Sequence, residues 1–493
     1  MPETIALHEF HSLMNKAYYT KKGERVFRHD FRTYAQWPYL GRKEAEEFHG
    51  KFKDKKGELT VLNIGIGDGG QMKNFVKRLK ELDSEKGTGL TKRLKVVMGD
   101  FSTKLLDNAK KNQFLQDAFE GVDVEYKHVN ALDMPFDNEV DQIILNELMD
   151  DLGGITVTKK NKKFFVKQLK LKQKLPDTTF FKDNQKLRAA RERVEDLKLA
   201  AGEKEFAALA IFKHTKERGA KDAFDELKAK REKMIPTDVA KAVVNKDWES
   251  IMQLDPESFK NVRALFDDDE QELPPKEVAR YGLAEELFPE GKDVSVPVSS
   301  FDFLEGAYRA LKPGGRLTSN DYGYLEPSHV QPTKKGEEWT VEGQPTMNVI
   351  TRFIQDHGKK VGLNVVKVEK QSQFLGNDVL EISPSRLMES MLGFAGESKP
   401  GRAFAMFFGI KHRGKRMAEK GEVFAPADTK WQLYPGRMVH MDEIKAIRDM
   451  LVPPDAKAWD KRIESLKKES DESKSRTEDH NFYRITLEKP STT

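Results

Sequence analysis

The chain contains no cysteine, and this absence excludes several kinds of chemistry. Disulfide bonds, thiolate nucleophiles, iron–sulfur clusters and cysteine-ligated zinc all require that side chain. The 11 histidines are scattered without the regular spacing of a helical metal site, so we expect no metal centre. Any catalysis must therefore use oxygen and nitrogen groups.

Long apolar runs and a strong net charge are also missing. No apolar stretch approaches the roughly 20 residues that a membrane span needs, and residues 1–10 lack the basic and apolar regions of a signal peptide. A net charge of +4 on 493 residues does not by itself indicate a nucleic-acid-binding protein. We expect a cytoplasmic protein with no membrane association, built from about three domain-sized units.

The most informative segment is a glycine-rich turn that follows a short apolar run. Residues 59–64 predict a buried strand, and residues 71–82 have the apolar spacing of a helix. The turn between them carries four glycines, Gly65, Gly67, Gly69 and Gly70. Glycines let the chain turn tightly and let a ligand approach the backbone, so this order of elements predicts a nucleotide site.

The glycines also fit the dinucleotide pattern G-x-G-x-x-G, which leaves the cofactor open. The next predicted strand ends at Asp100, where a carboxylate could bind a ribose diol. Asp100 lies 30 residues beyond Gly70, whereas dinucleotide folds place this acid about 20 residues on. The spacing favours S-adenosylmethionine, with a nicotinamide or flavin cofactor, or a turn without a ligand, as alternatives.

Strand and helix patterns alternate in two parts of the chain, and this predicts an α/β fold with a parallel sheet. The turn Pro313-Gly-Gly315 before a strand, and a final strand at 482–488, are features of the Rossmann-like sheet of class I methyltransferases. We therefore expect seven strands, the last one antiparallel. The expected units are a helical cap (1–58), the first part of the core (59–178), a mostly helical insertion (179–296), the second part of the core (297–376), a helical C-terminal insertion (377–478) and the last strand with the tail (479–493).

The insertion that begins after residue 151 has three recognisable parts. Residues 155–172 predict a β-hairpin that turns at 160–162. Eight lysines and no acid lie between Lys159 and Lys174, so the hairpin could bind nucleic acid or an acidic substrate; the alternative is a sheet edge protected by lysines. Residues 187–201 carry a heptad seam typical of a helical hairpin. Residues 235–296, rich in acid and proline, are expected to form a connector with short helices.

Polar residues follow five of the predicted strands, and ligands of open parallel sheets bind beyond the carboxyl ends of strands. The glycine turn is expected to contact the methionine part of the cofactor, and Asp100 its ribose hydroxyls. The adenine is expected to contact the segment after the third strand, Ala131, Leu132 and Asp133. Asn146, after the fourth strand, is expected beside the transferable methyl group.

The candidate catalytic residues are Asn146, Glu147, Asp150 and Tyr322. Methyl transfer is an in-line displacement, so a protein aligns the acceptor and removes a proton. Glu147 could hold an arginine guanidinium with two hydrogen bonds while Asn146 orients it. Asp150 is a second partner or base, or else caps a turn. Tyr322 is expected either to stack on the substrate or to pack in the core.

Several segments together resemble the MidA family of class I methyltransferases. They are Tyr18-Tyr-Thr-Lys-Lys-Gly23, Asp30-Phe-Arg-Thr33, Asp100-Phe-Ser102, Asn146-Glu-Leu-Met-Asp150, Asp321-Tyr-Gly323 and residues 371–375. The matched blocks cover roughly 1–170 and 295–376. The resemblance implies S-adenosylmethionine as cofactor, with Ser102 in its site. Mitochondrial members of that family assist complex I assembly by methylating an arginine.

The predicted function is methyl transfer from S-adenosylmethionine to a protein side chain such as arginine. Methylation of RNA or of a small molecule is the alternative that the lysine-rich hairpin suggests. A further alternative is an assembly factor with weak catalysis, because Asn63 stands where the family usually has an acid before the glycines. A protein substrate is the expected partner.

Overall fold

The computed structural model describes residues 4–22, 38–171, 242–253, 262, 266–330, 347–382, 422–424, 430–432, 438–442, 444–445, 456–477 and 481–491. The expected heptad seam at 187–201 and the family block at Asp30–Thr33 lie outside the described residues. All statements about the fold concern the described part of the chain.

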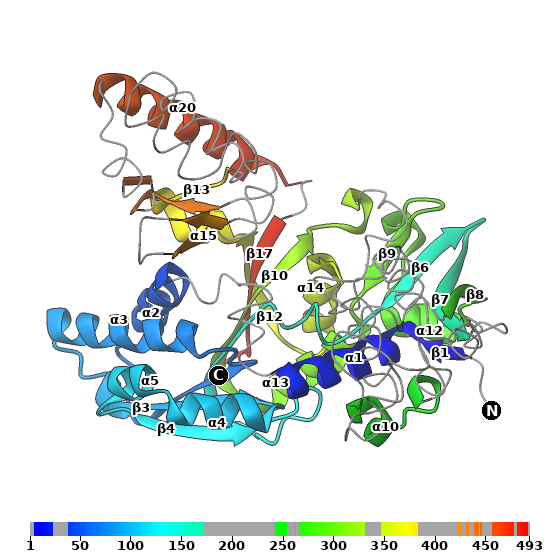
Figure 1. The fold of residues 1–493 in the computed structure, drawn as a ribbon, viewed down its shortest axis with the longest axis horizontal. Helices are drawn as coiled ribbons and strands as arrows, with labels where there is room; N and C mark the ends of the chain where they lie inside the picture. The colour runs from blue at the N-terminus through cyan, green and yellow to red at the C-terminus, as the bar shows by residue number, and fades with distance from the viewer. Residues whose placement is uncertain are drawn as a thin grey trace, which may run out of the picture.

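The core is one twisted sheet, and its topology confirms the predicted class I methyltransferase fold (Figure 1). Its strands, in spatial order, are β12 (Asn364–Lys370), β17 (Asn481–Glu488), β10 (Leu311–Tyr324), β5 (Val140–Asn146), β2 (Leu59–Ile64), β3 (Leu94–Asp100) and β4 (Asp123–His128). Strand β17 runs antiparallel to both of its neighbours, and the other pairs are parallel. A short strand, β11 (Val349–Ile350), pairs with the end of β10. Dinucleotide folds lack this inserted antiparallel strand.

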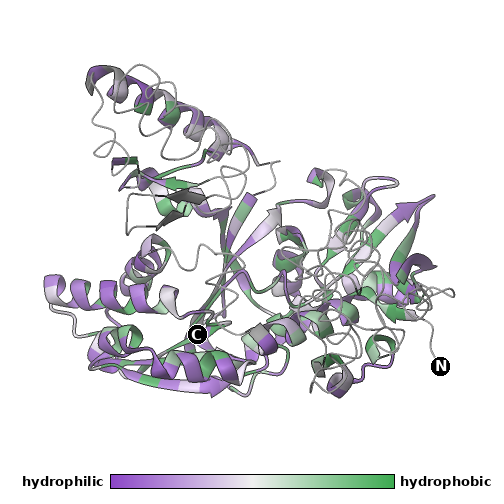
Figure 2. Ribbon diagram, viewed as in Figure 1, coloured by the Kyte–Doolittle hydropathy of each residue, from purple (hydrophilic) through white to green (hydrophobic). Residues whose placement is uncertain are grey.

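Apolar side chains on both faces of the sheet explain why helices cover it on both sides. Strands β2 and β5 are buried along their whole length. One face packs against α2 (Pro38–Phe52), α3 (Gly70–Lys86) and α5 (Gln113–Phe119), and the other against α13 (Val298–Ala310) and α14 (Thr351–Lys360). Figure 2 shows the hydrophilic residues of α3 on the outside of this arrangement. Burial of two apolar faces is the main stabilising contribution to the core.

One expected helix is in fact two. The pattern at 103–119 predicts a single helix, but α4 (Thr103–Lys111) ends before Asn112 and α5 begins after it. The Asn112 side chain accepts a hydrogen bond from the Phe114 N–H at 3.1 Å. Asparagine favours such N-cap positions because its oxygen satisfies a free donor, and the break follows from that.

A second sheet lies beside the core and contains the predicted hairpin. Strands β6 (Ile155–Lys160) and β7 (Lys163–Leu171) are joined by Asn161 and Lys162, which both have positive φ angles, 51° and 64°. Strand β1 (Thr4–Ala6) also pairs with β7, and β9 (Asp293–Val296) pairs with β6. The hairpin is thus confirmed, and it joins two distant segments, β1 and β9, into one sheet.

The acid-rich segment near residue 270 corrects two expectations. It was expected to belong to a connector, but residues Phe266–Glu272 form strand β8, which pairs with β7. Ion pairs join Lys163 to Glu272 at 3.0 Å and Lys160 to Glu270. The idea of a lysine-protected edge at β7 is therefore wrong, because an acidic strand covers it. Short helices do occur nearby, at α10 (Trp248–Gln253) and α12 (Pro275–Tyr281).

The described part of the C-terminal insertion docks on the end of the core. Helix α20 (Ala456–Ser475) lies beside β13 (Val379–Leu380), which pairs with β16 (Val439–His440). The buried carboxylate of Glu381 accepts hydrogen bonds from Lys370 at 3.1 Å, Ser473 at 2.9 Å and Asn481 at 2.8 Å. This network ties the insertion to β12 and β17. Among the described helices, none has the length and apolar character needed to cross a membrane.

Candidate functional site

The turn after β2 has the backbone geometry that its glycines predict. Gly65, Gly67 and Gly69 have φ angles of 72°, 54° and 79°, a region that other residues rarely adopt. The Gly65 N–H donates to the Gly99 carbonyl at 2.9 Å, which joins the turn to the end of β3. Helix α3 then begins at Gly70, whose N–H donates to the Asp68 carboxylate at 2.8 Å, so the first turn of α3 lies at the carboxyl edge of the sheet.

Asp100 connects this turn to the next helix. One carboxylate oxygen accepts the Ile66 N–H at 3.0 Å, and the other accepts the Ser102 N–H at 2.8 Å. Burial raises the pKa of Asp100 to about 6, against the opposing effect of these hydrogen bonds. Since each carboxylate oxygen has two lone pairs, Asp100 keeps acceptor capacity for the ribose hydroxyls that the sequence assigns to it.

The other expected cofactor residues occupy two neighbouring segments. Ser102 is buried and caps α4, because its hydroxyl accepts the Leu105 N–H at 3.4 Å. After β4, the Asn130 side chain accepts the Leu132 N–H at 3.1 Å and closes a tight turn. Within that turn Ala131 is buried and Asp133 is exposed. Both segments follow strands that pair in register with β2 or β3.

Glu147 stands at the end of β5 in a left-handed backbone conformation, with φ of 49°. Its N–H donates to the Asn320 carbonyl at 2.8 Å, and its carboxylate accepts the Asn146 amide at 3.0 Å. Non-glycine residues in this region cost about 1–3 kcal/mol and cluster at functional sites. No pattern in the sequence predicts this backbone conformation.

The side chain of Asn146 shows whether the site fits S-adenosylmethionine. Its side chain is buried, and its Oδ1 atom has no hydrogen-bond partner among the residues that the structure describes. A buried carbonyl oxygen without a donor is costly, so such an atom requires an explanation. The ammonium group of S-adenosylmethionine is a suitable donor, and Asn146 lies next to the glycine turn through the pairing of Ile64 with Leu145. The residues therefore fit this cofactor.

Carboxylates from two strand ends gather beside Glu147. The Asp321 carboxylate, at the end of β10, accepts the N–H groups of Met149 at 2.9 Å and Asp150 at 3.3 Å. Burial, and then the charges of Asp150 and Glu147, raise the pKa of Asp321 well above its ordinary value. Asp150 is itself buried. This excess of negative charge suits a cationic acceptor.

Helix α1 (Leu7–Lys22) covers this acid cluster, and the sequence did not identify the residues that hold it there. The Tyr19 hydroxyl donates to Asp151 at 2.7 Å, and the Asn15 amide donates to the Asp151 carbonyl at 3.0 Å. The Asp151 N–H also closes a turn onto the Leu148 carbonyl. Tyr19 belongs to the family-like segment Tyr18–Gly23, but no pattern in the sequence pairs it with Asp151.

Two further residues singled out from the sequence have clear positions. Tyr322 is half-buried, and its ring lies edge-on to Phe482 with 5.8 Å between centroids. Asn63 is buried, and its amide donates to the Ile144 carbonyl at 3.2 Å, which links β2 to β5. An aspartate at this position could not donate that hydrogen bond, so the amide is consistent with the local structure.

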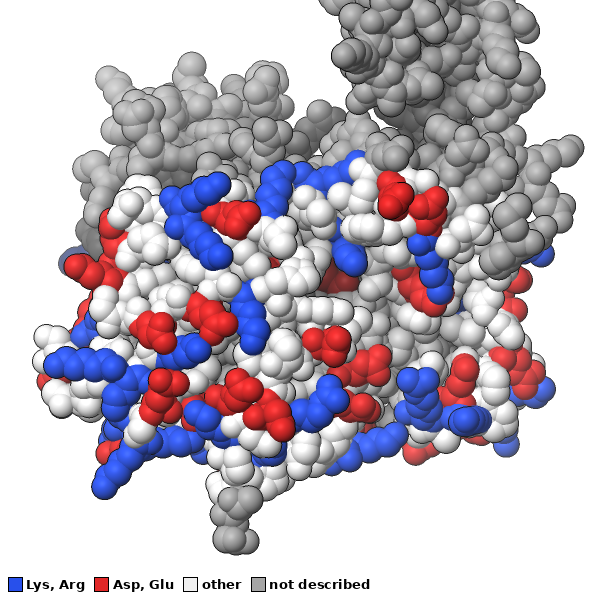
Figure 3. Space-filling view, turned by 90° about the horizontal axis from the view of Figure 1, so that it is seen from below, with Lys and Arg blue, Asp and Glu red and all other residues white. Residues whose placement is uncertain are grey.

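The surface charge does not gather by sign on the face shown in Figure 3. Lysines and arginines lie among aspartates and glutamates there, without a broad patch of either sign. On the hairpin, Lys167 pairs with Asp293, and Lys163 and Lys160 pair with β8. Four of the six described lysines of the hairpin, Lys159, Lys160, Lys163 and Lys167, thus form ion pairs with acids.

No family model matches the chain, and a search of curated proteins finds no match. Similar solved structures include a likely methyl transferase from Burkholderia thailandensis bound to S-adenosyl-homocysteine, which is 13% identical over 99% of this chain and 88% of that one, with a TM-score of 0.48. A phosphoethanolamine N-methyltransferase 2 from Haemonchus contortus is 13% identical over 100% and 62% of the two chains, with a TM-score of 0.35. A geranyl diphosphate C-methyltransferase from Streptomyces coelicolor is 10% identical over 90% and 76%, with a TM-score of 0.30. At such identities the likeness concerns the fold alone.

Proposed function

We propose that this chain is an S-adenosylmethionine-dependent methyltransferase that acts on a nitrogen of a protein side chain such as arginine. The observation that carries the proposal is the meeting, at one sheet edge, of a glycine turn with three positive φ angles and a cluster of buried carboxylates. The MidA resemblance of the sequence points to the same reaction and to the same acceptor.

The cofactor would lie against the glycine turn. Asp100 would accept hydrogen bonds from its ribose hydroxyls, and Asn146 Oδ1 would accept one from its ammonium group. The turn at Ala131 to Asp133 would flank its adenine. When bound, S-adenosylmethionine supplies an activated methyl group on a sulfonium. N–H groups in the first turn of α3, other than that of Gly70, which donates to Asp68 at 2.8 Å, would bind its carboxylate.

Glu147, Asp150 and Asp321 account for the choice of a cationic nitrogen acceptor. A guanidinium held by the Glu147 carboxylate would lose hydration and gain two directional hydrogen bonds. Asp150 would receive the proton that the attacking nitrogen releases, because it is buried next to Asp321, whose carboxylate accepts the Asp150 N–H at 3.3 Å. Helix α1 would exclude water from the acid cluster.

The test is transfer of a labelled methyl group to proteins of an extract that lacks the enzyme. Glu147→Gln is expected to lower the rate by about 10²-fold or more, the range of a lost general base or substrate anchor. Glu58→Gln is the matched control, because Glu58 is exposed and precedes β2 at the opposite edge of the sheet. An unchanged rate in Glu147→Gln would show that the assigned role is wrong.

The RNA alternative rests on the lysine-rich hairpin, and four of its six described lysines pair with acids. A nucleic-acid site would give binding that weakens steeply with salt. We expect extract RNA to bind weakly and with a shallow salt dependence. Filter binding between 50 and 200 mM salt, roughly the range over which phosphate contacts are lost, measures this directly.

A further inference from the structure

Helix α2 lies directly on the first turn of α3. A Cβ atom at Gly41 would come within 2.3 Å of the Gln71 carbonyl oxygen, so only glycine permits this approach. Gln71 follows the glycine turn and belongs to the first turn of α3. The position of α2 therefore bears on the segment that would contact the cofactor.

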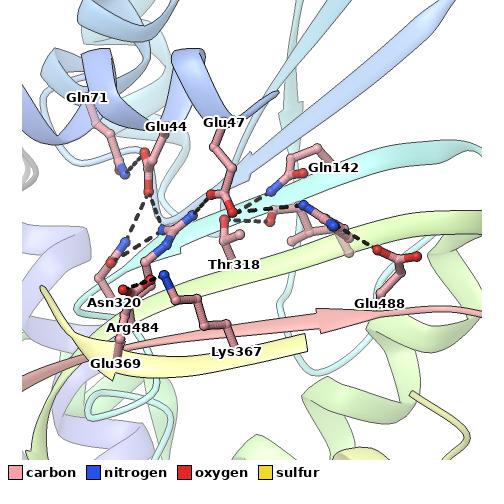
Figure 4. A network of polar contacts seen from close by, with 12 residues as sticks. Glu44, Glu47, Gln71, Gln142, Thr318, Asn320, Lys367, Glu369, Arg484 and Glu488 are labelled. Atoms are coloured by element: carbon pink, nitrogen blue, oxygen red, sulfur yellow. Dashed lines mark hydrogen bonds and ion pairs between the residues drawn. The ribbon is translucent and has the colours of Figure 1, made fainter. Parts of the chain in front are cut away.

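The Glu44 carboxylate, on α2, joins three elements of the core (Figure 4). One oxygen accepts the Gln71 amide at 2.7 Å. The other accepts the Asn320 amide at 3.0 Å and the Arg484 guanidinium at 3.2 Å. All four side chains are buried, with exposed fractions of 5% or less. Glu44 thus touches α3, β10 and β17 at one point.

Two of these partners, Gln71 and Asn320, connect Glu44 to the cofactor side and to the acceptor side of the proposed reaction. Gln71 fixes the helix that begins at the glycine turn, on the cofactor side. The Asn320 carbonyl holds the N–H of Glu147 at 2.8 Å, on the acceptor side. The Asn320 side chain is held by Glu44, and the Asn320 carbonyl holds the backbone of Glu147. Asn320 therefore connects Glu44 to Glu147.

The charge of Glu44 is compensated within the network. Arg484 is 1% exposed, lies 3.9 Å from the centroid of the Phe374 ring, and also binds Glu47. Burial raises the pKa of Glu44, and the charge of Arg484 offsets part of that effect. Buried ion pairs add little net stability but are costly to break, which makes them suited to fixing a geometry.

We propose that Glu44 is a positioning residue that sets the glycine turn and Glu147 at a fixed separation through Gln71 and Asn320. This inference rests on the proposed methyl transfer, in which donor and acceptor must meet in line. Displacements of about 1 Å can cost such reactions about 10²-fold in rate. Glu44 contacts neither reacting group, so its effect would be exerted through geometry alone.

The experiment compares Glu44→Gln with Glu47→Gln, a change of the same kind on the same helix. Glu47 is partly exposed and binds Arg484 and Arg316, and it forms no hydrogen bond with Gln71 or Asn320. Methyl transfer, S-adenosylmethionine affinity by calorimetry, and melting temperature are measured for both. We expect kcat of Glu44→Gln to fall about 10²-fold with at most about a tenfold change in cofactor Kd. Glu47→Gln should stay within about twofold in kcat, and its melting temperature should fall less, because the ion pairs of Glu47 are partly exposed.

A double variant, Glu44→Gln with Gln71→Glu, provides a rescue. It reverses the direction of the hydrogen bond between the two helices and keeps the number of buried charges unchanged. We expect it to recover at least about tenfold of the lost kcat. Equal losses of kcat in Glu44→Gln and Glu47→Gln, or a double variant no better than the single one, would overturn the positioning role. An inactive wild-type protein would instead overturn the proposed methyl transfer, and the inference with it.

Discussion

The Tyr19 hydroxyl donates a 2.7 Å hydrogen bond to the Asp151 carboxylate, and this contact fastens α1 to the segment after β5. Burial, and then the charge of Asp151, raise the pKa of Tyr19 well above its ordinary value, so the hydroxyl stays a donor at neutral pH. The two residues are 132 positions apart, and their contact closes one side of the acid cluster.

Tyr19→Phe is expected to lower the free energy of unfolding by about 1.5 kcal/mol, because Asp151 loses a donor in a partly buried site. Urea denaturation measures this change. Tyr308→Phe is the control, since the Tyr308 ring packs under the Lys489 ammonium and should keep that contact. Equal free energies of unfolding for the two variants would mean that the Tyr19 hydroxyl does not stabilise the fold.

The pKa of Asp100 near 6 predicts a specific dependence of stability on pH. An aspartate in the unfolded chain has a pKa of about 3.9, so between these values the folded state holds the proton more tightly. The contribution of Asp100 to the free energy of unfolding is therefore complete below about pH 4 and is lost as the pH rises through 6. The loss amounts to up to about 3 kcal/mol. We expect the wild type to lose stability relative to Asp100→Asn over this range. A constant difference between the two proteins from pH 4 to 7 would contradict the assignment.

The left-handed backbone at Glu147 predicts that activity and stability change in opposite directions. Asparagine tolerates this conformation better than glutamate, and the change removes a charge beside Asp321. We expect Glu147→Asn to raise the free energy of unfolding by about 1 kcal/mol while methyl transfer falls. Thermal unfolding and the labelled-methyl assay test the two effects separately. A variant that is both inactive and less stable would argue against strain at this site.

Gly323 is expected to tolerate no side chain. Its φ angle is 155°, and a Cβ atom there would lie 2.0 Å from the Val349 carbonyl oxygen. Gly323→Ala should cost about 2 kcal/mol or more, because β11 would have to move away from β10. Gly50→Ala, in α2 with open space around it, should instead stabilise by about 0.5–1 kcal/mol. Chemical denaturation of both variants checks the pair.

Local patterns in the sequence were sufficient for the core strands and the glycine turn. The apolar run before Gly65 and the strand that ends at Asp100 could be located because apolar periodicity and glycine conformation act over a few residues. The carboxyl ends of those strands then gave the candidate site, since parallel strands bring their ends to one edge. The antiparallel last strand, expected at 482–488, is confirmed as β17, which lies between β12 and β10.

What the tertiary structure alone decided is which polar groups meet. The acidic residues Asp267–Glu272 have a low intrinsic preference for a β-strand. They form one nevertheless, because lysines of β7 lie opposite them. Glu44 meets Asn320 and Arg484 across 276 and 440 positions, and nothing in their neighbouring residues marks them as partners. Apolar burial has little directional preference, so the local periodicity of apolar residues is enough to predict it. A hydrogen bond needs a partner at about 3 Å, which only the packed chain supplies.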